Sequence, residues 1–185
     1  PADKRLYGIR VKEVPARQSL SGIPAGESAG TVEVWHPDVR FFTIDDGNGK
    51  QLGSFYLDLF SRSNKRAGAW MNTLDTGSPS TPETPGKPRL GMVCLNIHPP
   101  AAGDTVILSH REVRTLFHEF GHLLHLMFTR VSIPSLAGTS VPRDFVEVPS
   151  QFMENWCWRP DVLKSFARHE RTGLPIPEEM LNSLD

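Results

Sequence analysis

The segment from Ser109 to Phe128 most constrains the fold, because its apolar residues recur at the spacing of an α-helix. The apolar side chains that would share one face are Val113, Leu116, Phe117, Phe120, Leu124 and Met127. Ser109 is suited to cap the first turn, and Glu112 stands where it can complete a capping box. The pattern predicts a helix of about five turns. One face of that helix has to be buried against another part of the chain.

The residues before Ser109 carry the patterns of strands and turns instead. Strands are predicted within the ranges 6–14, 31–44, 51–60 and 91–97. Asp46-Gly47 and Asn48-Gly49 tolerate the backbone angles of a tight turn between the second and third strands. The fourth strand, GMVCLNI, is followed by Pro99-Pro100, and we interpret it as the edge of a sheet. Loops are predicted at 16–30 and 75–91, and an irregular segment or short helix at 61–74.

Further helices are predicted after the chain breaks at Pro134, Gly138 and Pro142. A second helix is expected from Asp144, with a kink at Pro149. Third and fourth helices are expected within 159–173 and 176–184. Strands in 1–108 and helices in 109–185 indicate an α+β fold, in which a small, mostly antiparallel sheet precedes a bundle of helices.

Composition excludes several classes of protein. A net charge of −1 gives no field that would attract nucleic acid or a membrane surface. No apolar run reaches the ~20 residues that a membrane span needs. Cys94 and Cys157 are far apart in the sequence and are interpreted as buried free thiols. We expect one soluble domain, cytoplasmic by default because no export segment is visible.

The first predicted helix contains the sequence TLFHEFGHLLH. On an α-helix His118 and His122 are about one turn apart on the same side, so both imidazoles can reach one ion. Glu119 stands beside them and can act on a water molecule without being a ligand. This is the HExxH arrangement of zinc peptidases, in which the ion activates water and the glutamate takes its proton. The alternative is a solvated helix face that carries histidines by chance.

A catalytic zinc needs a third protein ligand. Glu147 lies beyond His122 on the second predicted helix, and a carboxylate from a neighbouring helix can complete a His₂Glu site. The alternative role for Glu147 is in a capping box, because Asp144 precedes it by three residues. We predict one Zn²⁺ per chain, held by His118, His122 and Glu147, with Glu119 as the general base.

Several segments together resemble the family of thimet oligopeptidase, oligopeptidase A and dipeptidyl carboxypeptidase, which are zinc metallopeptidases. The resemblance is carried by TLFHEFGHLLH, DFVEVPSQFMENW, FYLDLFSRSNKRAGAWM, VWHPDVRFFTI and FARHERTGLPIP, and so extends along nearly all of the chain. It implies a zincin-like catalytic core of the gluzincin type, with the ligands and base named above. It also implies a soluble peptidase that hydrolyses short peptides. From charge and composition we expect no nucleic-acid partner and no membrane partner.

The length of the chain departs from this family. Members are several times longer and carry, after the region matched here, a segment rich in Gly, Tyr and His that supplies oxyanion donors. We therefore expect residues 1–185 to be part of the catalytic domain of a larger metallopeptidase. The alternative is an inactive zinc-binding fragment, since loss of one oxyanion donor typically lowers turnover by ~10²–10³. Self-association through apolar surface is also expected.

Other residues are weaker candidates for the site. Glu154, or less strongly Gln151, could accept a hydrogen bond from a ligand histidine, although a salt bridge would equally explain Glu154. His125 is interpreted as a hydrogen-bonded or core histidine rather than a fourth ligand, and Gly121 leaves room for another backbone, a substrate or simple packing. The expected contacts with the substrate come from Met92, Val93 and Cys94 of the edge strand and from Gly138 and Thr139.

Overall fold

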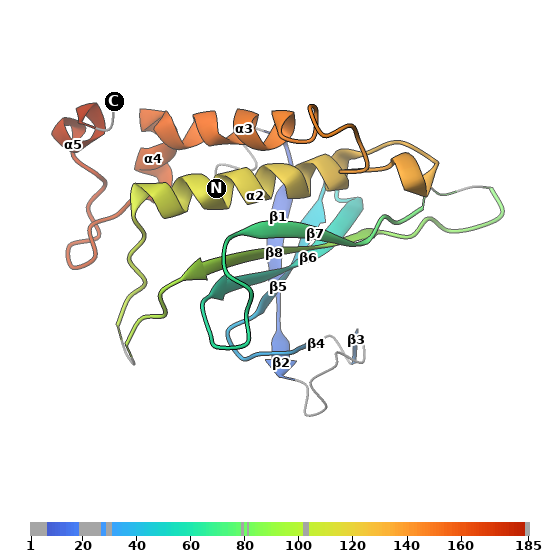
Figure 1. The fold of residues 1–185 in the computed structure, drawn as a ribbon, viewed down its shortest axis with the longest axis horizontal. Coiled ribbons are helices and arrows are strands. Elements are labelled where there is room, and N and C mark those ends of the chain that lie inside the picture. Colours follow the sequence, from blue (N-terminus) through green and yellow to red (C-terminus); the bar gives the residue numbers. More distant parts are fainter. Residues whose placement is uncertain are drawn as a thin grey trace.

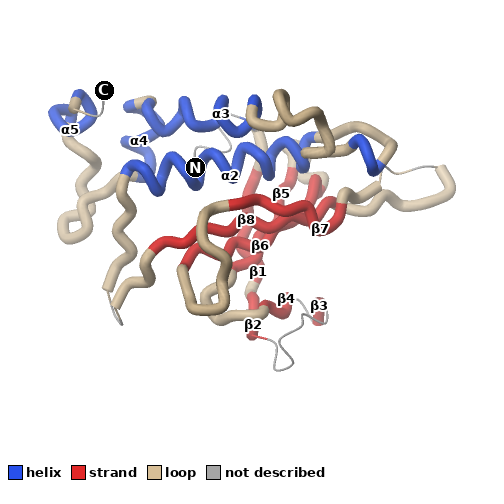
Figure 2. Tube along the Cα trace, in the orientation of Figure 1, coloured by secondary structure: helices blue, strands red, loops and turns tan. Residues whose placement is uncertain are grey.

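The computed structural model describes residues 7–18, 27–28, 31–78, 80, 82–101 and 104–183. Its strands form a twisted sheet that is covered on one face by the long helix α2 (His110–Phe128). The shorter helix α3 (Val148–Glu154) packs on α2, on the side away from the sheet (Figure 1). The expected α+β class is therefore confirmed: the helices lie together beside the sheet (Figure 2), and the described strands come before these helices along the chain.

The main sheet is mixed, with the strand order β1-β5-β6-β8-β7. Its strands are β1 (Arg10–Val14), β5 (Arg40–Asp45), β6 (Gln51–Phe60), β8 (Arg89–Ile97) and β7 (Trp70–Asp75). Strands β6 and β8 run parallel, and the other neighbours run antiparallel. A second, small sheet contains β2 (Ala16–Gln18), β4 (Thr31–Val34) and β3 (Glu27–Ser28).

Helix α2 begins where its capping residues predict. The backbone N–H of Glu112 donates to Ser109 Oγ at 3.3 Å, and the Glu112 carboxylate accepts from the Ser109 N–H at 2.7 Å. The later helical elements are short: η1 (Pro134–Leu136), η2 (Asn155–Trp158), α4 (Pro160–Phe166) and α5 (Glu178–Asn182). In the described part of the chain, none of the helices combines the length and apolar character needed to cross a membrane.

The sheet separates two apolar clusters because side chains alternate along each strand. Phe55 and Val93 face α2 and pack in the cluster that contains Leu123 and Leu126. Their neighbours Tyr56 and Met92 face the other way, toward Val32, Val34, Val39 and Phe41. Helix α2 is thus fixed on one face of β8, and this contact sets the position of its histidines.

Several sequence predictions were wrong in detail. Strand β8 is not an edge, since β6 and β7 pair with its two sides. The edge strand next to β8 is β7, which occupies part of the segment predicted as irregular or helical. The second helix begins at Val148 rather than Asp144, and Pro149 lies in its first turn, where no kink is needed. The third ends at Phe166. The loop predicted at 16–30 contains β2 and β3, and its remaining residues lie outside the described part.

Candidate metal centre

Two histidines of α2 and one glutamate at the start of α3 converge. The rings of His118 and His122 have centroids 4.9 Å apart and are nearly perpendicular, at 83°. Glu147 Oε2 lies 3.1 Å from His118 Nε2 and 3.2 Å from His122 Nε2. The possible ligand atoms of all three residues lie within 4.8 Å of one another. The sequence spacing on one helix and the turn before the next thus bring these three residues together.

The geometry and chemistry of this cluster fit a zinc ion. Ligand atoms bound tetrahedrally at about 2.0–2.1 Å are about 3.3 Å apart, close to the 3.1 and 3.2 Å that separate Glu147 Oε2 from the two Nε2 atoms. The two histidine side chains are only 24% and 12% exposed, which argues against a solvated helix face. Glu147 is the N-cap residue of α3 and makes no side-chain capping bond, so the capping-box alternative does not describe it. Two imidazoles and a carboxylate are a ligand set that suits catalytic zinc.

The second nitrogen of His118 has a partner of its own. His118 Nδ1 and Glu154 Oε1 are 2.6 Å apart, and Arg114 Nε lies 3.5 Å from the other oxygen of that carboxylate. A carboxylate at Nδ1 favours the tautomer whose Nε2 lone pair faces Glu147, which is the tautomer that can bind a metal through Nε2. Burial lowers the pKa of His122, and the neutral form favoured in this way is the one that binds metal.

Gly121 allows the two helices to approach. A Cβ at this position would lie 2.6 Å from Ser150 Cα and 2.8 Å from Pro149 O, closer than real side chains come. Three roles for Gly121 were considered from the sequence: room for another backbone, for a substrate, or for simple packing. The structure shows the first, and the backbone that occupies this space is that of α3. Because Gly121 lies between the two histidines in sequence, this contact brings the beginning of α3, and Glu147 with it, next to them.

Glu119 lies next to the cluster but is not part of it. It is 7% exposed and borders a cavity of about 490 Å³ that His118, His122 and Glu147 also line. Burial raises the pKa of Glu119, an effect that the nearby His118 counteracts. A carboxylate with a raised pKa beside a metal site is suited to accept and return a proton near neutral pH.

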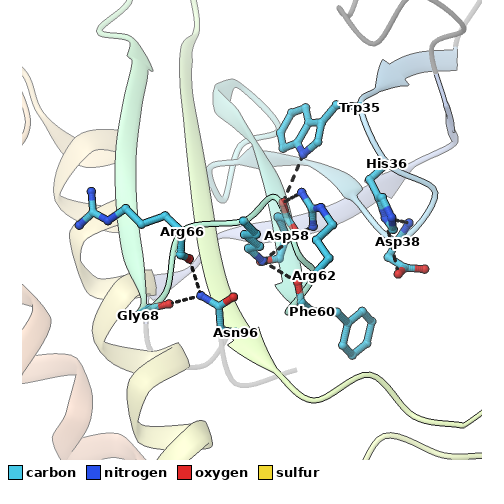
Figure 3. Close-up of polar contacts among 10 residues, drawn as sticks. Trp35, His36, Asp38, Asp58, Phe60, Arg62, Arg66, Gly68 and Asn96 are labelled. Atoms are coloured by element: carbon cyan, nitrogen blue, oxygen red, sulfur yellow. Dashed lines mark hydrogen bonds and ion pairs between the residues drawn. The ribbon is translucent and has the colours of Figure 1, made fainter.

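Strand β7 forms another wall of the same cavity, which the sequence analysis missed. Ala69, Trp70 and Met71 line it at the start of this strand, and the backbone of Met71 lowers the pKa of Glu119, against the effect of burial. The loop between β6 and β7 is held in place by a buried carboxylate at the end of β6. Asp58 is 2% exposed and accepts from Arg62 at 2.7 and 2.8 Å (Figure 3).

Two further residues bind the same loop to the sheet. Lys65 Nζ, whose side chain is 3% exposed, donates to Asp58 Oδ1 at 2.9 Å. The Asn96 amide donates to the backbone oxygens of Arg66 and Gly68, at 2.8 and 2.6 Å (Figure 3). The loop that leads to β7 is therefore held at several points. The sequence signal that could have revealed it is the set of charges at 58, 62 and 65, the first at the end of the apolar strand β6 and the other two just after it.

The weaker candidate residues are scattered. Thr139 lines the cavity, but Gly138 is buried against Leu126 and takes a positive φ of 58°. Val93 faces the core below α2, while Met92 and, by alternation, Cys94 face the opposite side of the sheet. This placement does not support the substrate contacts predicted for Met92, Val93 and Cys94.

The two remaining polar candidates also lie away from the cluster. His125 lines a different cavity, with Phe128 and Phe152. Gln151 is exposed, and its backbone N–H donates to Glu147 O. Cys94 and Cys157 are free and buried, as predicted.

Known proteins are similar to this chain in sequence. The model of peptidase family M3 matches residues 3–185. Oligopeptidase A of Escherichia coli (strain K12) is 45% identical over 182 residues, which is 98% of this chain and 24% of the relative. Dipeptidyl carboxypeptidase of the same strain is 44% identical over 149 residues, 80% of this chain and 21% of the relative. The probable cytosolic oligopeptidase A of Arabidopsis thaliana is 41% identical over 172 residues, which is 90% of this chain and 24% of the relative. The chain spans about a quarter of the length of these curated relatives.

Proposed function

The chain belongs to peptidase family M3, and from this premise we propose that it forms the zinc-binding catalytic centre of a metallopeptidase that hydrolyses short oligopeptides. One observation carries the proposal: His118, His122 and Glu147 converge within 4.8 Å, beside the buried carboxylate of Glu119. A chance arrangement of histidines on a helix would not bring a carboxylate from another helix to both Nε2 atoms.

Each residue of the centre has a role in this proposal. His118, His122 and Glu147 hold the ion, and Glu154 orients His118 through Nδ1. When bound, zinc acts as a Lewis acid toward the peptide carbonyl and lowers the pKa of a water molecule to about 7. Glu119 accepts a proton from the attacking water and delivers it to the leaving amine. Burial, which raises the pKa of Glu119, makes the carboxylate a better acceptor for that proton.

The substrate would bind along the outer edge of β7, which has no further strand beside it in the described part of the chain, rather than on β8. An extended peptide can add to a sheet edge through backbone hydrogen bonds, which suits broad sequence tolerance. Ala69, Trp70 and Met71 begin this edge and line the cavity that contains Glu119 and the ligands. Thr139 lies on the same cavity and is the remaining candidate for a side-chain contact. The proposal includes a cytoplasmic location, which two buried free cysteines support.

A zinc determination and a peptide-cleavage assay test the function. We expect one zinc per chain and cleavage of a short fluorogenic peptide. Glu119→Gln should keep the zinc and lower kcat by ~10²–10⁴, because it cannot accept the proton. His118→Ala should lose the zinc. Glu170→Gln, the same substitution at an exposed position, should change neither property.

The outcomes separate the two functions considered. A chain that holds zinc and cleaves no peptide would be a zinc-binding fragment without catalysis. A chain that binds no zinc under any condition would contradict both. Retained cleavage in Glu119→Gln would contradict the role of that residue and leave the metal centre in place.

A further inference from the structure

The hydroxyl of Ser150 contacts the carboxylate that faces both histidines. Ser150 is fully buried in the first turn of α3, three residues after Glu147. Its Oγ lies 2.9 Å from Glu147 Oε2, the oxygen that approaches His118 and His122. The same Oγ also lies 2.9 Å from the backbone oxygen of Glu147. The single hydroxyl proton can be donated to only one of these two acceptors at a time.

The carboxylate is the better acceptor for this proton. The backbone oxygen of Glu147 already accepts the N–H of Gln151 at 2.9 Å. A hydrogen bond to an ionised oxygen is roughly twice as strong as one between neutral groups. Since a carboxylate oxygen has more than one lone pair, Glu147 Oε2 can accept from Ser150 and still face the imidazoles.

Glu147 needs such a restraint more than the histidines do. Its side chain is 48% exposed, and a glutamate in contact with solvent has several rotamers of similar energy. The imidazole of His118 is held at Nδ1 by Glu154, and His122 is enclosed, at 12% exposed. Ser150 itself is fully buried, and its Cα packs closely against Gly121, which restrains its position.

We infer that Ser150 is a positioning residue: its buried hydroxyl holds the Glu147 carboxylate in the rotamer that completes the metal centre. This inference rests on the proposed function, because it assumes that Glu147 is a ligand. It adds a residue to the centre that binds no metal and touches no substrate. Ser150 acts through Glu147 alone, so its loss should weaken zinc binding while the fold is kept.

The test is the zinc affinity of purified chains, measured by competition with a chromophoric chelator. Ser150→Ala should raise the Kd for zinc about tenfold or more, the usual effect of losing a group that orients a ligand. The absorption bands of the Co²⁺-substituted chain should shift as well. Ser165→Ala is the matched control, since Ser165 Oγ makes the same kind of bond to Val162 O on α4, at 2.6 Å. It should leave the Kd unchanged.

A double-mutant cycle separates positioning from a general loss of structure. In a Glu147→Ala background, Ser150→Ala should cause no further loss of zinc affinity, because the group that it orients is gone. An equal loss in both backgrounds would overturn the inference. A Ser150→Ala chain that binds zinc with the wild-type Kd would also overturn it. So would a Ser150→Ala chain whose far-UV circular dichroism differs from that of the folded wild type. If the wild-type chain binds no zinc, the proposed function fails and this inference fails with it.

Discussion

At the scale of single residues, Asp58 shows how a buried charge is kept ionised. Burial acts to raise the pKa of its carboxyl group, but hydrogen bonds from Arg62 and Lys65 outweigh that effect and leave the pKa below its usual value. Trp35 Nε1 donates a further hydrogen bond, at 3.2 Å. Because the acceptor lies at the end of β6 and two of its donors in the following loop, the charge ties the loop to the sheet.

Asp58→Asn should lower the free energy of unfolding near neutral pH by about 3 kcal/mol, because two cations then lose their buried counter-charge. The pKa of Asp58 is lower in the folded chain than its value of 3.8 in the unfolded chain. The stabilisation is therefore present above that pH and is lost as the pH falls through the folded-state value. The cost of the substitution should shrink in acid. Urea unfolding of both chains from about pH 7 to about pH 2 measures it.

The matched control is Asp161→Asn. Asp161 pairs with Arg159 at 3.2 Å, but both side chains are more than half exposed, so the substitution should change the free energy of unfolding by less than about 1 kcal/mol. A cost for Asp58→Asn that is the same at every pH would mean that packing, and not the charge, explains the effect.

At the scale of elements, the crossing of α2 and α3 assembles the centre. Gly121→Ala should separate these helices, since the new Cβ would lie 2.6 Å from Ser150 Cα and backbone atoms would have to move. Alanine favours a helix by ~1 kcal/mol over glycine, so helix propensity alone predicts that the substitution would stabilise the chain. We expect a lower melting temperature for the metal-free chain and a higher Kd for zinc, measured by calorimetry and chelator competition.

Gly47→Ala is the control for this change. Among the described residues, a Cβ at Gly47 would meet only Gly8 O, at 3.4 Å, which is an ordinary contact. It should leave both the melting temperature and the Kd near their wild-type values. If Gly121→Ala raised the melting temperature and kept the zinc affinity, the close approach of the helices would not be needed to bring Glu147 to the histidines.

Local rules were enough to predict α2 and its histidines, because a capping box and a helical period depend on neighbours in sequence. The pairing of strands, in contrast, depends on residues that are far apart in sequence. Pro99-Pro100 correctly marked the end of β8, but which strands lie beside it depends on β6 and β7, which are distant in sequence. The start of α3 was misplaced because Asp144 resembles a cap. A helix from Asp144 would press the Pro149 ring against the carbonyl of Phe145, so the helix begins just before the proline.

At the scale of the whole molecule, apolar side chains gather on the outside of α2 and α3. Phe128, Val131 and Phe152 border a cavity of about 380 Å³ and are 39%, 43% and 55% exposed. Phe145, just before α3, is 49% exposed, and Val148, the first residue of α3, is 50% exposed. A grouping of this kind is unusual on a monomer and marks a surface that associates with other apolar surfaces.

The isolated chain should therefore self-associate, with an apparent mass that rises with concentration in light scattering. Phe152→Glu should shift the chain toward a monomer, because each copy would bring a charge into the apolar contact and leave it unpaired. Leu74→Glu is the matched control: Leu74 is also a half-exposed apolar residue, at 49%, but it lies on β7, outside the cavity bordered by Phe128, Val131 and Phe152. This variant should associate as the wild type does. A wild-type chain that is a monodisperse monomer at every concentration tested would show that the exposed residues are too weakly grouped to hold two copies together.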